Sequence, residues 1–543
     1  MEMKKTAEDN AWIKRVIPEL AAPSLGDNTA DVDRLVKGLR QRLKAVDVRV
    51  DFSLVKRLSR DLRAHDYCVE GVVYRDGDCW RLIDVFDGKE PKGVYGLSLD
   101  LGSSTLVLRL VDLTCGETLD EISFNNPQIE IGSDILTRIH FAGREGGLIK
   151  LQALVLDEIN HQIGNLVEEN GVTRKSIVGM TVAGNTTMTH LFLGLDPHWL
   201  CREPYIPVVN RPDLVNAREV GLGINPEAPV LVFPNVGSYF GGDLIAGILA
   251  SKMTEREDVS FLVDVGTNAE VVIGNRDWLM ACAGAAGPAL EGGVADMGMM
   301  AAPGVIDTVR IDPDTAVFTI GTIPVRDGSV ATEGRGPLGI CGSGLIDLVS
   351  QLFLAGLIDL MGKFVPDRCG ERLTEMDGIS HLNVVPADAS GTGKSLTLSQ
   401  IDIDGLIRSK AAMYTILTTI AKTVNIPFGD IGRFFVAGTF GSYINPRSAI
   451  NIGMIPDLPL STYVSLGNTS LTGATMALLG VDAQKSLFHI RDQITYLELN
   501  VNQEFMNLFS AAKFLPHTDR SLFPSVKTWG GDNTVPAGEK TGV

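Results

Sequence analysis

The sequence predicts an α/β protein that contains a duplicated domain, and two observations lead to this prediction. From Tyr95 onward, apolar strand-like segments alternate with amphipathic helical segments, as in α/β domains. Two segments also share one plan, with an apolar strand, Asp, an apolar residue, Gly, two small polar residues and a second strand: LSLDLGSSTLVLRLVD (97–112) and FLVDVGTNAEVVIGN (261–275). Asp100 and Gly102 align with Asp264 and Gly266, and the 164 positions between the copies fit a duplicated domain rather than a solenoid repeat.

A small α+β unit is predicted ahead of this repeat. Residues 1–29 are polar and are broken by Pro18, Pro23 and Gly26, which predicts a linker segment. From Asp31, apolar residues recur at steps of three and four, which predicts a helix, and a second helical stretch follows near residues 54–62. The segment VEGVVYRDGDCWRLIDVFDG has the pattern of a β-hairpin with Asp-Gly in its turn. Residues 30–92 are therefore expected to form a small middle domain.

Charge and cysteine content exclude several classes of partner. The 543 residues include 48 Lys plus Arg against 66 Asp plus Glu, a net charge of −18, and such an acidic surface repels phosphate backbones and anionic lipid. Neither nucleic acid nor a membrane is expected as a partner. The start of the sequence lacks an apolar signal segment, and no apolar run reaches the ~20 residues of a membrane span. Seven scattered cysteines without a Cys-x-x-Cys pair predict reduced thiols in a cytoplasmic protein.

Each copy of the repeated hairpin has the residues of an anion-binding turn. Its glycine permits the backbone angles of a tight turn, and the small residues that follow expose amide and hydroxyl groups, which together form an anion-binding concavity. The residues concerned are Gly102, Ser103, Ser104 and Thr105 in the first copy and Gly266, Thr267 and Asn268 in the second. The aspartates at the strand ends, Asp100 and Asp264, fit this chemistry if hydrated Mg2+ lies between carboxylate and phosphate. Two such hairpins facing each other would hold a polyphosphate and its metal; the alternative is two ordinary hairpins with satisfied turn amides.

Further glycine-rich segments follow apolar strands elsewhere in the chain. FFVAGTFGSYINP (434–446) ends a strand in glycines, an arrangement that lets an adenine ring lie against bare backbone. VGMTVAGNTTMTHLFLG (178–194) has a strand, then Gly184 and Asn185, then a helix. Asp243, in FGGDLIAG, precedes a helical run and is either a further acidic site residue or a helix N-cap. The run SGTGKSL (390–396) imitates a P-loop, but Asp388 occupies the required first glycine position, so a Walker A site is not expected.

The ordered set of glycine-rich turns resembles the superfamily of actin, sugar kinases and heat-shock chaperone ATPases, and seven separated blocks narrow the resemblance. These blocks are similar to the reductive activators of corrinoid proteins: FNNPQIEIGSDILTRI (124–139), VAGNTTMTHLFLGLDP (182–197), VDVGTNAEVVIGN (263–275), CAGAAGPALEGG (282–293), GICGSGLIDL (339–348), PLSTYVSLGNTSLTGATMALL (459–479) and FLPHTD (514–519). The resemblance covers residues 95–543, and residues 1–92 are similar to the linker and middle segments of that family.

The resemblance implies a fold and a set of roles. The fold is two ribonuclease H-like halves of the actin-like ATPase type, residues 95–258 and 259–543, preceded by the linker (1–29) and the small domain (30–92). ATP and Mg2+ are the implied cofactors. Asp100 and Asp264 would hold magnesium-bound waters and orient the attacking water. The other residues that the resemblance assigns are the two hairpin turns named above, Asn185, the acidic candidate Asp243, and the adenosine candidates Gly438, Thr439, Gly441 and Ser442.

The implied activity is the ATP-dependent return of cob(II) to cob(I) in a corrinoid protein of a methyltransferase system. The family typically carries an iron–sulfur ferredoxin domain ahead of the linker, and this sequence contains no cluster ligands. Either that domain lies outside the sequence, or electrons come from a separate ferredoxin-type donor. A homodimer follows the family. Two alternatives stay open: a small-molecule kinase of the same superfamily, which needs a carboxylate base, and a non-catalytic actin-like scaffold.

Overall fold

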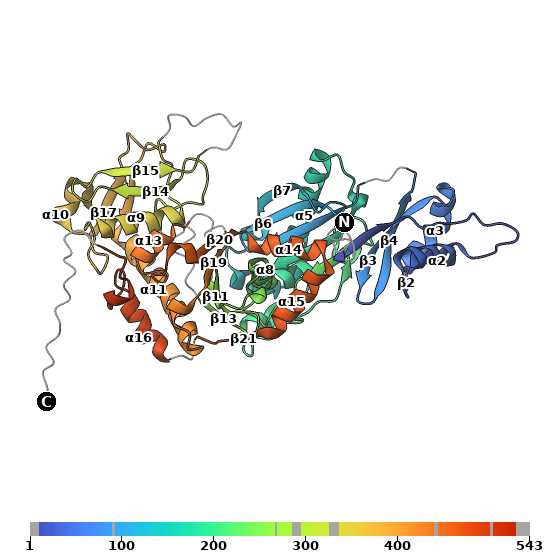
Figure 1. Ribbon diagram of the computed structural model, residues 1–543. Helices are drawn as coiled ribbons and strands as arrows, with labels where there is room; N and C mark the ends of the chain where they lie inside the picture. Colours follow the sequence, from blue (N-terminus) through green and yellow to red (C-terminus); the bar gives the residue numbers. More distant parts are fainter. Residues whose placement is uncertain are drawn as a thin grey trace. The chain divides into compact units, whose positions relative to one another are not determined.

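The computed structural model describes residues 10–89, 93–266, 269–284, 295–324, 336–438, 444–499 and 503–527. The chain divides into two compact units (Figure 1). The first contains the residues up to Thr254 together with Asn468–Ile494, and the second contains Glu255–Gly467 and the residues from Thr495 onward. The predicted domain limits stay a prediction, although the division after Thr254 lies close to the expected boundary at residue 258.

The small N-terminal domain belongs to the first unit and is an α+β layer. Its elements are β1 (Ile13–Val16), α2 (Asp31–Leu43), β2 (Val48–Arg49), α3 (Phe52–Ala64), β3 (Val69–Asp76) and β4 (Cys79–Asp87). The sheet order is β1-β3-β4-β2, and α2 and α3 bury their apolar faces in one cluster with the sheet. The predicted hairpin is confirmed, with Gly77 at φ +60° in its turn. Within the segment predicted as a linker, β1 pairs antiparallel with β3 and Trp12 is fully buried.

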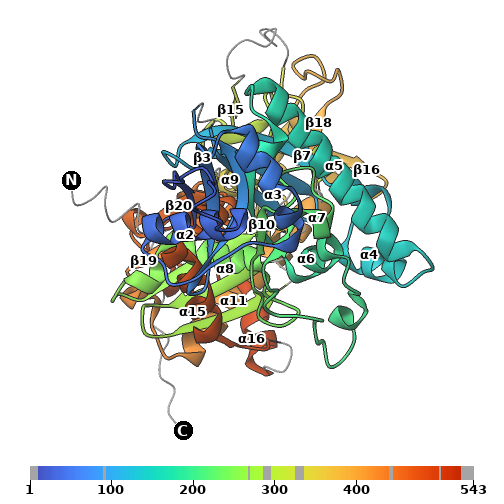
Figure 2. The same ribbon diagram turned by 90° about the vertical axis from the view of Figure 1, so that its right-hand side faces the viewer.

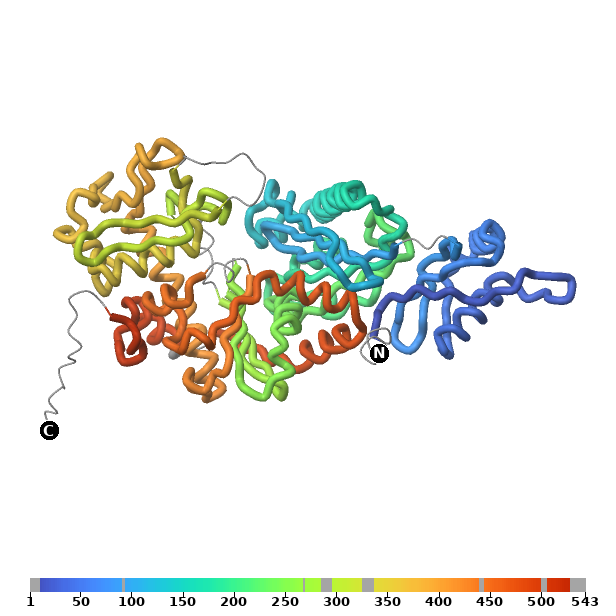
Figure 3. Tube along the Cα trace, turned by 45° about the horizontal axis from the view of Figure 1, so that its top comes forward, coloured from blue at the N-terminus to red at the C-terminus, as the bar shows by residue number. Residues whose placement is uncertain are grey.

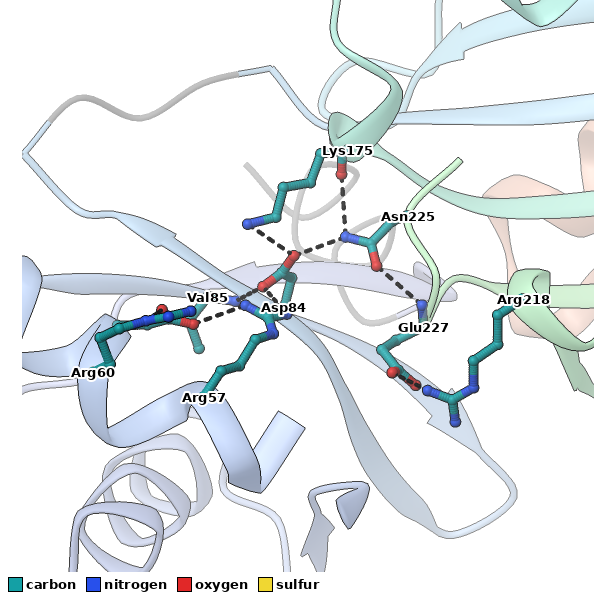
Figure 4. Close-up of polar contacts among 9 residues, drawn as sticks. Arg57, Arg60, Asp84, Val85, Lys175, Arg218, Asn225 and Glu227 are labelled. Atoms are coloured by element: carbon teal, nitrogen blue, oxygen red, sulfur yellow. Dashed lines mark hydrogen bonds and ion pairs between the residues drawn. The ribbon is translucent and has the colours of Figure 1, made fainter. Parts of the chain in front are cut away.

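A buried carboxylate joins this small domain to the rest of the first unit (Figure 4). The side chain of Asp84, on β4, is 1% exposed and accepts hydrogen bonds from Arg57 Nη2 (2.7 Å) and from the Nδ2 group of Asn225 (2.8 Å). Lys175 Nζ lies 3.5 Å from the same carboxylate. Arg57 belongs to α3, whereas Asn225 and Lys175 belong to the neighbouring domain. The carboxylate of Asp84 therefore binds cations and hydrogen-bond donors from both domains.

The first six-stranded sheet has the order β7-β6-β5-β8-β10-β9. Its strands are β5 (Tyr95–Leu101), β6 (Thr105–Asp112), β7 (Thr118–Asn125), β8 (Ile177–Gly184), β9 (Val215–Asn216) and β10 (Pro229–Val232). The β5–β6 and β6–β7 pairs are antiparallel, whereas β5–β8 and β8–β10 are parallel. The central strand β8 is buried along its whole length, as expected for a parallel strand covered on both faces.

Helices cover this sheet: α4 (Ile135–Ala142), α5 (Gly147–Glu169), α6 (Thr186–Leu193), α7 (Ala217–Val220), α8 (Gly242–Ser251), α14 (Thr469–Leu479) and α15 (Val481–Gln493). The long helix α5 buries residues at steps of three and four, from Leu151 to Leu166, and lies along β7 (Figure 2). Although α14 and α15 are late in the sequence, α14 packs on α8, β5 and β8. Gly473 permits this approach, because a Cβ there would lie 2.4 Å from the Ala246 carbonyl oxygen.

The second unit contains a six-stranded sheet with the order β20-β19-β11-β12-β13-β21. Its strands are β11 (Ser260–Val265), β12 (Ala269–Gly274), β13 (Leu279–Gly284), β19 (Arg433–Ala437), β20 (Tyr463–Gly467) and β21 (Ile494–Tyr496). The β11–β12 and β12–β13 pairs are antiparallel, whereas β11–β19 and β19–β20 are parallel. The series β13-β12-β11-β19-β20 therefore repeats β7-β6-β5-β8-β10 of the first unit, which is the duplication that the repeated hairpin predicted.

The remaining elements of the second unit pack around this sheet. They are β14 (Ile306–Ile311), β15 (Phe318–Thr322), α9 (Gly342–Leu354), α10 (Pro366–Cys369), β16 (Leu373–Met376), β17 (Ile379–Val385), β18 (Leu396–Ser399), α11 (Gln400–Thr423), α13 (Pro446–Asn451) and α16 (Gln503–Ala512). The hairpin β14–β15 packs on α9 (Figure 3), and β16–β18 form a separate three-stranded sheet. Helix α11 begins at a capping box formed by Ser399 and Asp402 and packs on β12 and β13.

Single turns of 3-10 helix complete the described secondary structure. They are Pro127–Glu130, Arg174–Ser176, His198–Cys201, Met253–Glu255, Gly370–Arg372, Phe428–Asp430, Leu460–Thr462 and Arg520–Leu522. Among the helices described, none combines the length and the apolar character needed to cross a membrane.

Candidate functional site

The first predicted phosphate loop is a tight turn between β5 and β6. Gly102 is required there, because a Cβ at this position would lie 2.3 Å from the carbonyl oxygen of Thr105. Two buried side chains hold the turn from behind: Asn126 Nδ2 donates to the Gly102 carbonyl (3.0 Å), and Arg138 Nη2 donates to the Ser103 carbonyl (2.7 Å). The sequence interpretation gave neither Asn126 nor Arg138 a role, although both lie in the block FNNPQIEIGSDILTRI (124–139).

Asp100, the next-to-last residue of β5, is held by the start of α14. Ser470 Oγ donates to one carboxylate oxygen and Asn468 Nδ2 to the other, both at 2.8 Å. Burial raises the pKa of Asp100, whereas the hydrogen bonds from Ser470 and Asn468 lower it, and the net direction is upward. The side chain keeps partial contact with solvent. Ser470 and Asn468 therefore orient the carboxylate of Asp100.

Asp243 lies in the first turn of α8 and joins Asp100 in one acidic pair. Burial is the main reason that its pKa is raised to about 6, and the charge of Asp100 raises it further. The alternative that Asp243 is a helix N-cap is wrong: Gly241 occupies that position, and Asp243 Oδ1 accepts a hydrogen bond from the N–H of Leu244 (2.9 Å). Asp243 is thus an acidic residue in the surroundings of Asp100, and its role in a site stays a prediction.

Asn185 lies at the end of strand β8, next to the acidic pair of Asp100 and Asp243. It follows β8 and caps α6, since its Oδ1 accepts a hydrogen bond from the N–H of Met188 (2.9 Å). A Cβ on Gly241 would lie 2.3 Å from the Asn185 Cα, so the start of α8 packs directly on this residue. Asp100, Asn185 and Asp243 therefore gather at the carboxyl ends of β5, β8 and β10, three adjacent parallel strands. In open α/β sheets this edge is the usual place for a ligand.

The second unit repeats this arrangement at the end of β11. Asp264 is the next-to-last residue of the strand and pairs in register with Ala437 of the parallel strand β19. Gly438 follows at φ +80°, and a Cβ there would lie 2.9 Å from Asp264 Oδ1. Gly266 comes directly after β11. The other residues predicted here lie outside the described residues: Thr267, Asn268, Thr439, Gly441 and Ser442.

The run of small residues at 281–293 begins in β13, and its described part is tightly packed. A Cβ on Gly284 would lie 2.5 Å from Ile416 Cδ1 of α11, which fits close helix–sheet packing. Near it, a cavity of about 500 Å³ is lined by Gly284, Arg408, Phe505 and Phe509 among others.

The imitation P-loop has the wrong surroundings for phosphate binding. Residues 390–395 lie in the connection between β17 and β18, which pair antiparallel, so no helix follows the glycine-lysine pair. A Walker A site needs a strand before and a helix after it. The prediction that this run binds no phosphate as a P-loop therefore agrees with the structure.

The described residues fit a magnesium–nucleotide site better than a metal cluster. Groups of three or more His, Cys, Asp or Glu side chains able to hold a metal do not occur in the described part of the chain. The partly exposed Asp100 and the nearby Asp243 supply the carboxylates that Mg2+ takes through its waters when substrate phosphates complete its shell. All seven cysteines are free and four of them are buried, and within the described residues they do not come together in a group of the kind that holds an iron–sulfur cluster.

Two sheets of the same strand order, each with an aspartate next to the end of the equivalent strand (β5 and β11), define an actin-like ATPase fold. Family models match the chain in order: the RACo linker region at residues 4–92, the RACo middle region at 95–256, and the C-terminal domain of RACo, the ASKHA domain, at 258–527. The chain belongs to the RACo family, the reductive activators of corrinoid proteins. This confirms the fold class and the family that the sequence predicted.

Individual relatives agree with this assignment. A solved structure described as a reductive activator for corrinoid, iron–sulfur protein is 37% identical, has a TM-score of 0.85, and is matched over 95% of this chain and 81% of its own. The corrinoid activation enzyme RamQ of Eubacterium limosum is 29% identical over 495 residues, 89% of this chain and 79% of RamQ. The [Co(II) methylated amine-specific corrinoid protein] reductase of Methanosarcina barkeri is 22% identical over 444 residues, 77% of this chain and 76% of its own.

Proposed function

We propose that this protein couples ATP hydrolysis to the one-electron reduction of cob(II) to cob(I) on a corrinoid protein of a methyltransferase system. Family membership supports the corrinoid protein as partner. The observation that carries the ATP-dependent part is the acidic pair of Asp100 and Asp243 beside the Gly-Ser-Ser turn at the carboxyl edge of a parallel sheet. A triphosphate with its metal is the ligand that combines an anion for the turn amides and a cation for the carboxylates.

The proposed roles follow the chemistry of each group. Asp100 and Asp264 hold the waters of Mg2+, which neutralises phosphate charge when it is bound. Asp243 accepts the proton of the attacking water, since a carboxyl group with a pKa of about 6 is largely ionised at neutral pH yet still basic enough to take a proton. The amides of Ser103, Ser104 and Thr105 bind phosphate oxygens, as do those of Gly266, Thr267 and Asn268 in the second hairpin.

Further roles complete the proposal. The backbone at Gly438 and Gly441, with Thr439 and Ser442, seats the adenosine. Asn185 keeps the ends of β8 and α6 in place beside the site. The electron comes from a ferredoxin-type one-electron donor, the active form is a homodimer, and the protein acts in the cytoplasm.

The test is ATP turnover measured together with the state of cobalt. The protein is incubated with MgATP, a one-electron donor and a cob(II)-loaded corrinoid protein, and the paramagnetic cob(II) signal is followed by electron paramagnetic resonance while phosphate release is measured. We expect loss of the cob(II) signal only when ATP is present, and faster phosphate release when the partner is added. An unchanged cob(II) signal under conditions of active ATP hydrolysis would contradict the proposal.

A small-molecule kinase is the second candidate, and the position of Asp243 favours it. A kinase of this superfamily needs a carboxylate base near the phosphates, and Asp243 supplies one beside Asp100. The two functions differ in their products. The activator releases phosphate to water in the presence of its corrinoid partner, whereas a kinase gives a phosphorylated acceptor in equal amount to the ADP formed.

A further inference from the structure

The three carbonyl groups of the first phosphate loop all point to donors behind the loop. Gly102 O accepts from Asn126 Nδ2 (3.0 Å), Ser103 O accepts from Arg138 Nη2 (2.7 Å), and Ser104 O accepts from the Asn126 N–H (2.8 Å). In a planar trans peptide the carbonyl and the following N–H point in opposite directions. Fixing these carbonyls from behind therefore turns the next three N–H groups to the opposite face, where an anion can bind them.

Arg138 is the charged member of this backing layer. It lies on α4 and is 0% exposed. Its Nε donates to the Gly132 carbonyl (2.9 Å), and its Nη1 lies 3.3 Å from Met188 Sδ and 3.4 Å from Gln128 Oε1, so all its partners are neutral groups. Within the described residues no carboxylate forms an ion pair with this guanidinium. A buried cation is normally compensated by an anion, and among the described residues Asp134 acts on the Arg138 charge through space only, without an ion pair.

We infer that Arg138 is a positioning residue for the phosphate loop, and that the phosphate of the bound nucleotide supplies the negative charge that this buried guanidinium lacks. The guanidinium reaches the ligand through the Ser103 peptide rather than by direct contact. It fixes the direction of the loop amides and adds a positive potential behind them. This inference rests on the proposed function, because it requires a phosphate ligand at the loop.

The other buried members of the layer hold Arg138 in place. Gln128 is 0% exposed, and its amide nitrogen donates to the Leu151 carbonyl of α5 (2.8 Å) while its Oε1 faces Arg138. Asn126 Oδ1 accepts from the Gln128 N–H (3.0 Å). One connected set of hydrogen bonds therefore runs from α5 to the loop carbonyls. If the role of Arg138 were purely structural, it would only hold these hydrogen bonds in place, and the charge of its guanidinium would not affect nucleotide binding.

The test compares ligands that share adenosine and differ in phosphate charge. Binding of a non-hydrolysable MgATP analogue, AMP and adenosine to the full chain is measured by isothermal titration calorimetry for the wild type, Arg138→Met and Arg138→Lys. We expect Arg138→Met to weaken triphosphate binding by about tenfold or more, AMP binding less, and adenosine binding by less than about twofold. Arg138→Lys keeps the charge but not the planar fork, so its triphosphate affinity lies between the other two.

Arg144→Met is the matched control. It removes the same charge from an exposed side chain six positions further on in the sequence. We therefore expect wild-type affinities for the MgATP analogue, AMP and adenosine. Equal weakening of all three ligands by Arg138→Met, or wild-type triphosphate affinity in the folded variant, would overturn the inference. If Arg138→Met does not fold, wild-type triphosphate affinity in Arg138→Lys would overturn the positioning role. A wild-type protein that binds no triphosphate would instead overturn the proposed function.

Discussion

Replacing Asp243 by Asn removes a partly buried negative charge that lowers the free energy of unfolding of the wild-type protein at neutral pH. Burial is the main cause that raises the pKa of this carboxyl group from 3.8 to about 6. Asn keeps the size of the side chain and can still accept the hydrogen bond from the N–H of Leu244. The substitution therefore tests the charge while it leaves the local packing in place. We expect Asp243→Asn to be more stable than the wild type at neutral pH and at least about 100-fold slower in ATP turnover.

The stability gain has a defined pH range. Between pH 3.8 and about 6 the unfolded wild-type chain releases a proton that the folded protein keeps. Wild-type stability therefore falls as the pH rises through this range and stays lowered above it, whereas the variant has no such loss. Two pKa units correspond to about 3 kcal/mol. Because Asp243 keeps partial contact with solvent, we expect a gain of about 1 to 3 kcal/mol above pH 6 and little difference near pH 4.

The assay is urea unfolding of nucleotide-free protein at several pH values from 4 to 8. Trp12 is buried in the first unit, which contains Asp243, and contributes to the tryptophan fluorescence that follows unfolding. Asp134→Asn is the control, because hydrogen bonds from Thr137 lower the pKa of Asp134 below 3.8, so its stability difference from the wild type should stay nearly constant from pH 4 to 8. A stability difference between Asp243→Asn and wild type that is the same at every pH would refute the assignment of a raised pKa to Asp243.

Three further substitutions test other parts of the structure. Asp264→Ala should reduce magnesium-dependent ATP turnover by at least about 100-fold while leaving the thermal transition in place, and full activity would show that the second hairpin is structural. Asp84→Asn should destabilise the first unit by about 3 kcal/mol in urea unfolding, whereas Asp87→Asn on the same strand should change it by less than about 0.5 kcal/mol. Gly438→Ala should lower turnover, because its φ of +80° costs a residue with a Cβ about 1 kcal/mol and the Cβ would displace Asp264. Gly429→Ala, which meets nothing within 4 Å, should retain wild-type turnover.

The parts of the fold that depend on neighbouring residues could be predicted from the sequence. The repeated hairpin and the helix from Asp31 are local patterns, and both are present in the structure. The pairing of β1 with β3 was not predicted, because it joins residues that lie far apart in the chain. Strand β1 also has few apolar residues, and Pro18 and Pro23 follow it closely. The polar composition of the segment therefore predicted a linker instead of a strand.

For the site, too, residues within one local sequence pattern could be predicted, whereas contacts between residues far apart in the sequence could not. Asp100 and the glycine turn follow from one hairpin pattern, so they were predicted with their chemistry. Arg138 belongs to a helix for which the spacing of apolar residues predicts only a role in packing. Its hydrogen bond to the Ser103 carbonyl joins residues that lie 35 positions apart in the sequence. The signal that could have identified it is an arginine on the buried side of a helix, since buried charges need a reason.

The aspartates of the two hairpins occupy equivalent strand positions, but the hairpin pattern does not show the long-range contacts on which Asp100 depends. Asp100 takes its donors from Asn468 and Ser470, which come 368 and 370 residues later, after the chain has passed through the second unit. Helix α14 also fills the first unit: Thr181 Oγ1 donates to the Ala474 carbonyl (2.8 Å), deep in its interior. The first unit is therefore complete only when the C-terminal part of the chain has been made. A fragment that ends at residue 254 would keep the Gly-Ser-Ser turn and lose the hydrogen bonds that orient Asp100, so the duplicated sequence motif does not define an independent functional half.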